Sequence, residues 1–294
     1  MAQLVIEAIE CKSPCSGIDA EVIEQASGVL SEAMKAGAGV AGTVKGYETV
    51  GEALKAASAV LAKAPGLIAA IDKASNSPDE LYLNLSNQPG ENKLWPFDKK
   101  YEKINKGQIV RPEFCLSFSQ AIDINLWEYD SVSSDDFIGR LTIDASKTEA
   151  GKFYSQIIES KEEGALYVVA YSVLPTRDRL SADEYLRPGE SLYSTNNKYS
   201  LEYQTDGNLV IYKSTGAGKQ ALWASNTNNK PAWRCVMQED GNLVVYGSQN
   251  NALWASGVYG SQYAGSKLIM QDDGNLVIYD KNDKSIWASG TNNR

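Results

Sequence analysis

The 294-residue sequence contains no histidine. This absence excludes catalysis by Ser-His or Cys-His pairs and removes the commonest zinc ligand. The sequence has no phosphate-binding glycine loop, and the adjacent acids Asp135 and Asp136 have no recognisable catalytic partner. We therefore expect a protein that is not an enzyme. There is also no run of about 18 apolar residues, which excludes an ordinary membrane-spanning helix.

Basic residues are fewer than acidic residues. The 28 lysines and arginines and the 37 aspartates and glutamates give a formal charge of −9. Residues 178–294 carry 11 of the basic and 12 of the acidic residues, so the rest of the chain carries a net charge of −8. This acidity argues against nucleic acid as a partner. The first residues lack the basic and long apolar regions of a signal peptide, so we expect synthesis in the cytoplasm, with release or action outside the cell.

Cysteine is scarce, and its four positions are Cys11, Cys15, Cys115 and Cys235. Four cysteines in a chain of this length do not form a disulfide framework. Cys11 and Cys15 are close enough in sequence to form a bond or to bind a metal. The alternative is that all four are reduced thiols.

One nine-residue pattern, Gln-x-Asp-x-Asn-x-Val-x-Tyr, occurs three times near the end of the chain, at intervals of 34 and 33 residues. A fixed period this short indicates a stacked or radial repeat. Alternation predicts a strand with these five residues on one face and the intervening Leu and Val or Ile towards a core. Asp-Gly-Asn within each copy predicts a tight bend or bulge. The positions are Gln204, Asp206, Asn208, Val210 and Tyr212, then Gln238, Asp240, Asn242, Val244 and Tyr246, then Gln271, Asp273, Asn275, Val277 and Tyr279.

The polar face of each repeat has the side chains that a sugar site needs. Gln and Asn offer donors and acceptors, Asp accepts and Tyr offers a hydroxyl, so together they can bond several neighbouring hydroxyls of a small ring. Val supplies an apolar floor for the C–H face of that ring, and Asn is expected to face the ligand. The alternative is a repeat that keeps its shape and binds nothing, although decay would first spoil the polar face of one copy.

The repeated pattern resembles the mannose-binding motif of the monocot bulb lectins, with all five positions matched in all three copies. The resemblance implies a three-sided β-prism that binds mannose-containing glycans without calcium or another cofactor. The segment Arg187-Pro-Gly-Glu-Ser-Leu192 is similar to the opening of that family's domain. The disulfide common in the plant lectins has no counterpart, because Cys235 is alone in this region.

A tryptophan follows each copy, within a Leu/Ile-Trp-Ala-Ser motif, at Trp223, Trp254 and Trp287. One Trp per repeat predicts three indoles that meet on an internal axis. The alternative is that they form stacking platforms for a sugar.

The chain before the repeats begins with an alternating segment at residues 3–10 that predicts a strand. Residues 19–75 are rich in Ala, Glu and Lys, and their apolar residues recur at helical spacing. They predict a helical hairpin with Asp19 as its first cap, a bend within 37–47, and Pro65 kinking or ending the second arm. Further strands are expected over residues 81–85, 114–118, 122–127 and 165–173.

The hairpin has two interpretations. It is either an amphipathic pair packed on a β-domain or a membrane-active segment that swings out. Small residues favour close helix contacts in lipid. Charged residues recur throughout both arms, so membrane insertion would require an oligomer to cover them.

Residues 126–139 resemble the third calcium loop of the protein-kinase-C-type calcium- and lipid-binding (C-two) sandwich. The resemblance implies that Glu128, Asp130 and Asp136 are calcium ligands, and Asp79 matches the first-loop aspartate of that family. Glu128 replaces the usual Asp, and no clear acidic partner precedes Asp79. Because calcium takes about six to eight oxygen ligands, the alternative is a sandwich that has kept the shape and lost the ion.

These patterns predict two domains. Residues 1–176 form an α+β domain, a β-sandwich with the helical hairpin of 19–75 inserted, and residues 177–294 form an all-β β-prism. We expect a mannose-binding lectin whose N-terminal domain is membrane-active, as in a glycan-targeted toxin or defence protein. The alternatives are a non-lytic agglutinin whose N-terminal domain drives homo-oligomerisation, and a lectin-like bacteriocin. The expected partners are mannose-containing glycans, a membrane surface and further copies of the chain.

Overall fold

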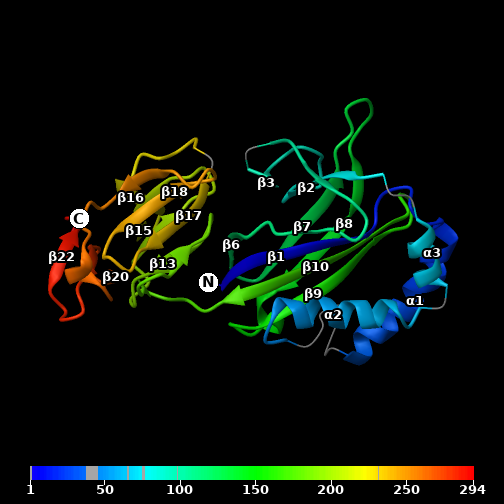
Figure 1. Cartoon of the computed structure of the whole chain (residues 1–294), viewed down its shortest axis with the longest axis horizontal. Helices are drawn as coiled ribbons and strands as arrows, with labels where there is room; N and C mark the ends of the chain where they lie inside the picture. The colour runs from blue at the N-terminus through cyan, green and yellow to red at the C-terminus, as the bar shows by residue number, and fades with distance from the viewer. Residues whose placement is uncertain (1, 38–45, 65, 75–76, 98, 231) are drawn as a thin grey trace. The chain divides into compact units, whose positions relative to one another are not determined.

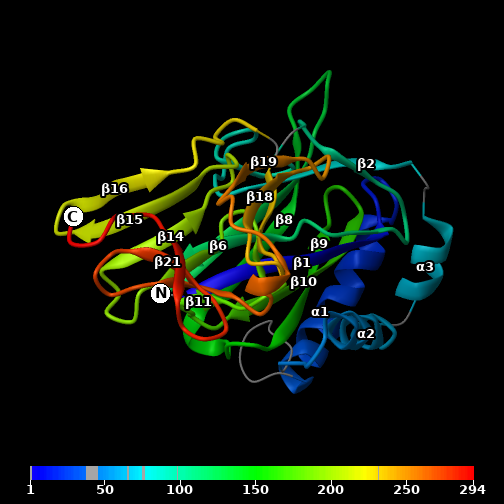
Figure 2. The ribbon, with the colours of Figure 1, turned by 60° about the vertical axis from the view of Figure 1, so that its left-hand side comes forward.

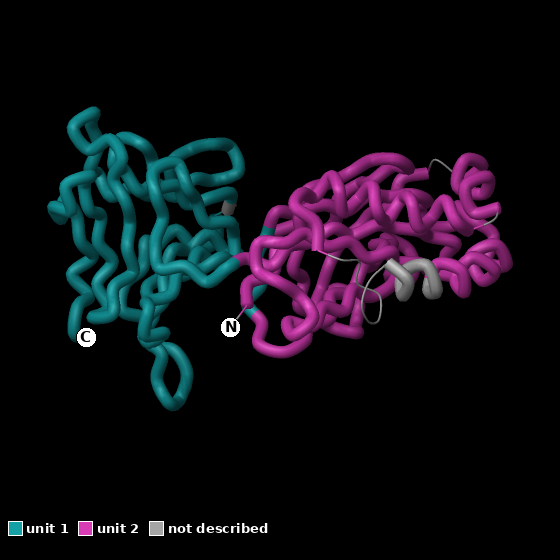
Figure 3. The backbone as a smooth tube through the Cα atoms, turned by 90° about the horizontal axis from the view of Figure 1, so that it is seen from below, with its two compact units in different colours: residues 1, 114–117, 175–294 teal, residues 2–113, 118–174 magenta. Residues whose placement is uncertain are grey.

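The computed structural model describes residues 2–37, 46–64, 66–74, 77–97, 99–230 and 232–294. The chain divides into two units, which are coloured separately in Figure 3. The C-terminal unit contains residues 114–117 and 175–294, and the N-terminal unit contains residues 2–113 and 118–174. The division between residues 174 and 175 lies close to the expected boundary after residue 176.

Two antiparallel sheets make up most of the N-terminal unit (Figure 1). The first has the order β5-β1-β10-β9, and the second has the order β3-β2-β7-β8 with β4 also paired to β2. The strands of the first sheet are β1 (Ala2–Ser13), β5 (Ile109–Val110), β9 (Phe153–Ser160) and β10 (Ala165–Leu174). Those of the second are β2 (Asp79–Asn84), β3 (Lys93–Trp95), β4 (Glu102–Ile104), β7 (Ala121–Glu128) and β8 (Asp136–Asp144). Residues 114–117 of β6 (Phe114–Phe118) belong to the C-terminal unit, and a 3-10 turn at Ala145–Lys147 completes the N-terminal unit.

The expected strands overlap with β1, β2, β6, β7 and β10. Strand β10 is buried along nearly its whole length, because both of its faces are covered. Leu166 and Val168 pack in a cluster with the helices, whereas the Tyr167 hydroxyl donates to Asp79 of β2. A strand buried on both faces reads as a continuous apolar run, as this one does.

Among the described residues, three helices precede the second sheet: α1 (Ala20–Gly37), α2 (Val50–Leu61) and α3 (Leu67–Lys73). The predicted cap is confirmed, since the Asp19 carboxylate accepts from the Glu21 N–H at 2.9 Å. Helix α2 begins with a capping box between Thr49 and Glu52. The expected bend of the hairpin at residues 37–47 lies largely outside the described residues, as does Pro65. The second arm is not one helix, because Gly66 adopts a left-handed conformation before α3.

The apolar faces of the helices pack on the first sheet. Leu54 and Leu61 of α2 lie in one buried cluster with Val168 of β10, and Figure 1 shows α2 running alongside β9 and β10. The hydroxyl of Ser155 on β9 donates to the Ala53 carbonyl at 2.8 Å. The described helices are thus packed on the β-sheet, as in the first interpretation of the hairpin. Among the residues described, none of the helices combines the length and apolarity needed to cross a membrane.

The C-terminal unit contains three four-stranded antiparallel sheets, one for each repeat (Figure 2). The first repeat forms β13 (Ser191–Tyr193), β14 (Tyr199–Tyr203), β15 (Leu209–Thr215) and β16 (Gly218–Ala224). The second sheet joins β12 (Tyr185–Leu186) to β17 (Ala232–Met237), β18 (Leu243–Gly247) and β19 (Ala252–Ala255). The third joins β11 (Arg179–Leu180) to β20 (Lys267–Met270), β21 (Leu276–Tyr279) and β22 (Ser285–Ala288), after a 3-10 turn at Ser261–Tyr263.

One short segment joins all three sheets. Strands β11, β12 and β13 follow one another within residues 179–193, and each pairs with a different repeat. Strands of two residues carry no detectable periodicity, so the sequence does not predict β11 and β12. The pairing makes residues 179–193 part of the fold.

The three sheets share one core, as the alternation predicts. Leu209, Leu243 and Leu276 and the Ile or Val two residues after each have no exposed surface. Against this core pack the three predicted indoles, with ring centroids 5.3, 6.4 and 6.1 Å apart and edge-to-face geometry. The tryptophans are partly rather than fully buried, so they close one end of the core.

This arrangement predicts a stability difference between two tryptophans. Replacing Trp254 with alanine should lower the unfolding free energy by about 3 kcal/mol, because the truncation leaves a cavity between the other two indoles. The same change at Trp233, which stacks on Arg234 at 3.6 Å outside the cluster, should cost clearly less. Denaturant unfolding followed by circular dichroism compares the two, and equal losses would contradict the core assignment.

Candidate functional site

Each Gln-x-Asp-Gly-Asn segment folds into a tight turn before its strand. In the first repeat the Gln204 N–H donates to the Asn208 carbonyl at 2.8 Å, and Gly207 has a φ of +88°. The same turn recurs in the other repeats, with Gly φ values of +92° and +90°. The predicted bend is therefore confirmed, but only Val and Tyr of each motif lie on a strand. Gln, Asp and Asn are presented by the turn, because glycine at positive φ redirects the chain there.

The aspartate and asparagine of each motif hold this turn in shape. Asp206 Oδ1 accepts from the Asn208 N–H at 2.9 Å, and the matching bonds in the other repeats measure 3.1 and 2.9 Å. Asn208 Oδ1 accepts from the Ser225 hydroxyl and the Thr227 N–H, both at 3.2 Å. The asparagine Oδ1 is used internally in every repeat, a role that the sequence does not predict. Its Nδ2 amide takes no part in these bonds.

Glutamine and tyrosine of each motif are joined by the same hydrogen bond. Gln Nε2 donates to the Tyr hydroxyl at 3.0, 2.8 and 2.8 Å in the three repeats. The bond orients both groups, so Gln Oε1 remains an acceptor and the Tyr O–H remains a donor. All five predicted positions of each repeat therefore gather at one place, although they come from a turn and a strand.

The valine of each motif is less open than expected. Val210, Val244 and Val277 are only 2–3% exposed. Val210 lies between Glu202 of β14 and Ala224 of β16, which are its partners across the sheet. Valine thus forms the covered base of the site rather than an open apolar floor.

Comparison with known proteins gives relatives for this part of the chain. No family model matches the chain. The B-type lectin plumieribetin of Scorpaena plumieri is 44% identical over 75 residues, which is 26% of this chain and 62% of that protein. A mannose-specific lectin of Narcissus pseudonarcissus is 43% identical over 74 residues, 24% of this chain and 62% of that lectin. The homologues of the C-terminal part are B-type and monocot mannose-specific lectins.

The C-terminal unit is thus an all-β domain with β-prism-like sheets, and it is similar in sequence to these lectins. The matches span less than two thirds of the length of these relatives. A solved structure of monomeric monocot mannose-binding lectins from Gastrodia elata is 43% identical over 39% of this chain and 98% of that chain, with a TM-score of 0.35. Each of these relatives is named as a lectin and not as an enzyme.

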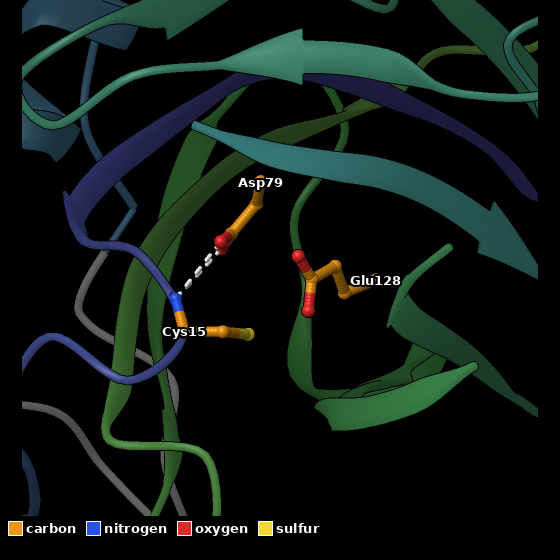
Figure 4. A group of neighbouring side chains, drawn as sticks. All are labelled: Cys15, Asp79 and Glu128. Atoms are coloured by element: carbon orange, nitrogen blue, oxygen red, sulfur yellow. Dashed lines mark hydrogen bonds between the residues drawn. The ribbon is translucent and has the colours of Figure 1, made fainter. Parts of the chain in front are cut away.

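The predicted calcium ligands of the N-terminal unit only partly converge. Asp79 at the start of β2 and Glu128 at the end of β7 lie together with Cys15, their ligand atoms within 4.8 Å of one another (Figure 4). Among the described residues, these three form the group whose side chains are close enough to hold a metal ion. The sequence suggests metal binding by Cys15 only together with Cys11, and no sequence signal links Cys15 to Asp79 or Glu128. None of the four cysteines forms a disulfide.

Asp79 is buried and well bonded. It is 1% exposed, its carboxylate accepts from the Cys15 N–H at 2.9 and 3.1 Å, and the Tyr167 hydroxyl donates to it. Burial raises the pKa of Asp79 above its usual range, although these hydrogen bonds oppose the shift. Burial, and next the charge of Asp79, raises the pKa of Glu128 to about 7.

Asp130 and Asp136 are not members of this group, although Asp136 pairs with Glu128 across β7 and β8 and both charges add to the rise in the Glu128 pKa. The Asp130 carboxylate accepts from the Val132 N–H at 2.7 Å and the Ser133 hydroxyl at 2.5 Å, so it stabilises its own loop. These bonds lower the pKa of Asp130. One thiol and two carboxylates do not fit the all-oxygen shell that calcium prefers. Calcium binding by Asp79, Glu128, Asp130 and Asp136 thus stays a prediction without a convergent site among the described residues.

The raised pKa of Glu128 predicts a pH dependence of stability. Between the ordinary glutamate pKa of about 4.3 and the folded value of about 7, the folded protein binds more protons than the unfolded chain, so stability falls as pH rises. Glu128→Gln cannot ionise and should lose this component. Its melting temperature relative to the wild type should rise from about pH 5 to about pH 7.5. A difference that stays constant over this range would contradict the assignment.

Proposed function

We propose that the lectin domain binds mannose-terminated glycans at three equivalent sites without a metal ion. The observation that carries this proposal is the hydrogen bond from Gln Nε2 to the Tyr hydroxyl, which recurs in all three repeats. Together with the internally bonded Asp and Asn, it leaves the same set of groups facing outwards in each repeat. The relatives of this part of the chain include mannose-specific lectins, which supports the same ligand.

The outward groups suit a ring with neighbouring hydroxyls. Each site offers two acceptors, Gln Oε1 and Asp Oδ2, and two donors, Asn Nδ2 and the Tyr O–H. A sugar hydroxyl both donates and accepts, so two neighbouring hydroxyls can satisfy the whole set. Binding exchanges hydrogen bonds to water for hydrogen bonds to protein, and the net gain is about 1 kcal/mol per bond. A single site should thus be weak, with Kd of millimolar order, and three sites gain avidity on a dense glycan surface.

Asp206→Asn, Asp240→Asn and Asp273→Asn together test the sites with little structural change. Asparagine keeps the Oδ1 that accepts the backbone N–H of the turn, but it places a donor where Asp Oδ2 accepted. We expect the triple variant to lose retention on mannose-agarose, with a melting temperature close to that of the wild type. Wild-type retention should be unchanged by a chelator. Undiminished retention of the triple variant would contradict the proposal.

The second expected function, beyond sugar binding, is membrane activity of the N-terminal unit. We propose that any such activity depends on glycan docking, because the residues before 178 carry a net charge of −8 and anionic lipid repels them. Release of the helices would also expose apolar side chains that pack on β9 and β10. The packed helices equally support a non-lytic agglutinin that acts outside the cell and assembles through this unit.

Dye release from liposomes separates these two functions. With mannose-bearing glycolipid present, a lytic protein should cause leakage that rises steeply with protein concentration, whereas an agglutinin should cluster the vesicles without leakage. The triple aspartate variant, which lacks sugar binding, is the matched control for both effects. Equal leakage with and without the glycolipid would contradict glycan-dependent docking.

A further inference from the structure

A cavity of about 670 Å³ lies on the sheet of the first repeat. Six of its ten lining residues carry a hydroxyl group, which is the kind of surface that hydrogen-bonds sugars. The residues used below are Arg177, Asp178, Tyr193, Ser200, Ser214 and Lys219. The last four come from β13, β14, β15 and β16 in turn, so the cavity extends across the whole sheet.

The strand register places this cavity directly beside the first sugar site. Tyr193 pairs with Ser200, and Ser200 pairs with Tyr212, so these three side chains form one row on one face. Ser214 follows Tyr212 by two residues, so it lies on the same face about 6.7 Å further along the strand. It pairs in turn with Lys219. The lining of the cavity therefore begins where the motif of the first repeat ends.

Lys219 connects the cavity with the sugar site. Its Nζ lies 2.5 Å from Glu202 Oε1 and 5.8 Å from the centre of the Tyr212 ring. Because the lysine is already paired with a carboxylate, the two together offer a donor and an acceptor with no net charge. Arg177 is likewise paired with Glu190 at 2.8 Å, and Asp178 with Arg179 at 2.7 Å. A neutral sugar fits such a lining better than a phosphate or an acidic sugar.

The far wall of the cavity is held in place by the third repeat. The Asp272 carboxylate accepts from the Thr195 hydroxyl at 2.6 Å and from the Asn196 N–H at 2.8 Å. The Ser214 N–H donates to the Lys198 carbonyl at 2.8 Å, which ties the β13–β14 loop to β15. These bonds fix the loop before any ligand arrives, so little ordering is left for binding.

The first repeat differs from the other two at this place. Its hairpin is three residues longer, since Tyr212 and Trp223 are 11 residues apart, whereas the matching tyrosine and tryptophan in the other repeats are 8 apart. Lys219 lies in the longer part. The position of Ser200 is taken by Arg234 in the second repeat, which stacks on Trp233, and by Lys267 in the third, which pairs with Asp283 at 2.6 Å.

We propose that this cavity is a second sugar subsite, which takes the neutral sugar next to a terminal mannose bound at Gln204–Tyr212. The proposal rests on the proposed mannose binding. It makes the first repeat selective for oligosaccharides, whereas the second and third repeats bind the terminal sugar alone.

The test isolates the first repeat in the full chain with Asp240→Asn and Asp273→Asn. Calorimetric titration of this double variant with an α-linked mannobiose should give an affinity at least about fivefold higher than with methyl α-mannoside, as one or two added hydrogen bonds provide. Ser214→Trp, which fills the cavity, should remove this preference and leave the affinity for methyl α-mannoside unchanged. Ser200→Arg, which copies the second repeat, should do the same by a different side chain.

Ser248→Trp in the same double variant is the matched control, because Ser248 occupies the position of Ser214 in the second repeat and is exposed. It should leave the preference intact. Equal affinities for the two sugars before any cavity variant, or a preference that survives both Ser214→Trp and Ser200→Arg, would overturn the subsite and leave mannose binding standing. Loss of binding to both sugars in the double variant would instead overturn the proposed function, and the subsite with it.

Discussion

The hydrogen bonds of the motif asparagines join the sugar motif to the core motif in every repeat. Ser225, which follows Trp223-Ala, donates its hydroxyl to Asn208 Oδ1 and accepts from the Leu209 N–H at 3.0 Å. Ser256 and Ser289 make the same pair of bonds in the other repeats. The turn that presents Gln, Asp and Asn is thus fixed to the strand that carries the indole. Core and site are one structural unit, because a shift of the tryptophan strand would move the asparagine.

This coupling explains why the polar positions are identical in all three repeats while their surroundings are not. Residues within this network of hydrogen bonds, between the motif turn and the tryptophan strand, have the same partners in each repeat. One arrangement therefore occurs three times. Residues outside the network, such as Ser200 and Lys219, have partners that differ from sheet to sheet. The longer hairpin of the first repeat leaves this network unchanged, so the proposed second subsite can form beside one motif without disturbing the other two.

The sequence was sufficient for features that depend on periodicity and composition. Alternation predicted the inward Leu and Ile, and the recurring tryptophans predicted their contact, because a shared apolar core leaves few other places for them. It was insufficient where a side chain serves two purposes. The sequence predicts Asn208 as a ligand residue, yet its Oδ1 accepts a hydrogen bond that stabilises the turn. No sequence signal indicates that Cys15 contacts Asp79, which is 64 residues away. Such pairings come from long-range packing, which no local pattern records.

The difference in net charge between the two parts of the chain indicates which part can approach an acidic surface. The proposed sugar sites consist of groups that are neutral or internally bonded, and residues 178–294 carry a net charge of only −1. Hydrogen-bonded recognition of this kind depends little on salt, whereas the rest of the chain, at −8, is repelled by acidic surfaces at distances set by the ionic strength. Under the proposed function, attachment to a cell surface therefore depends on the sugar sites, which act over hydrogen-bond distances. Several weak sites that bind simultaneously can offset this repulsion, whereas a single site of millimolar affinity cannot.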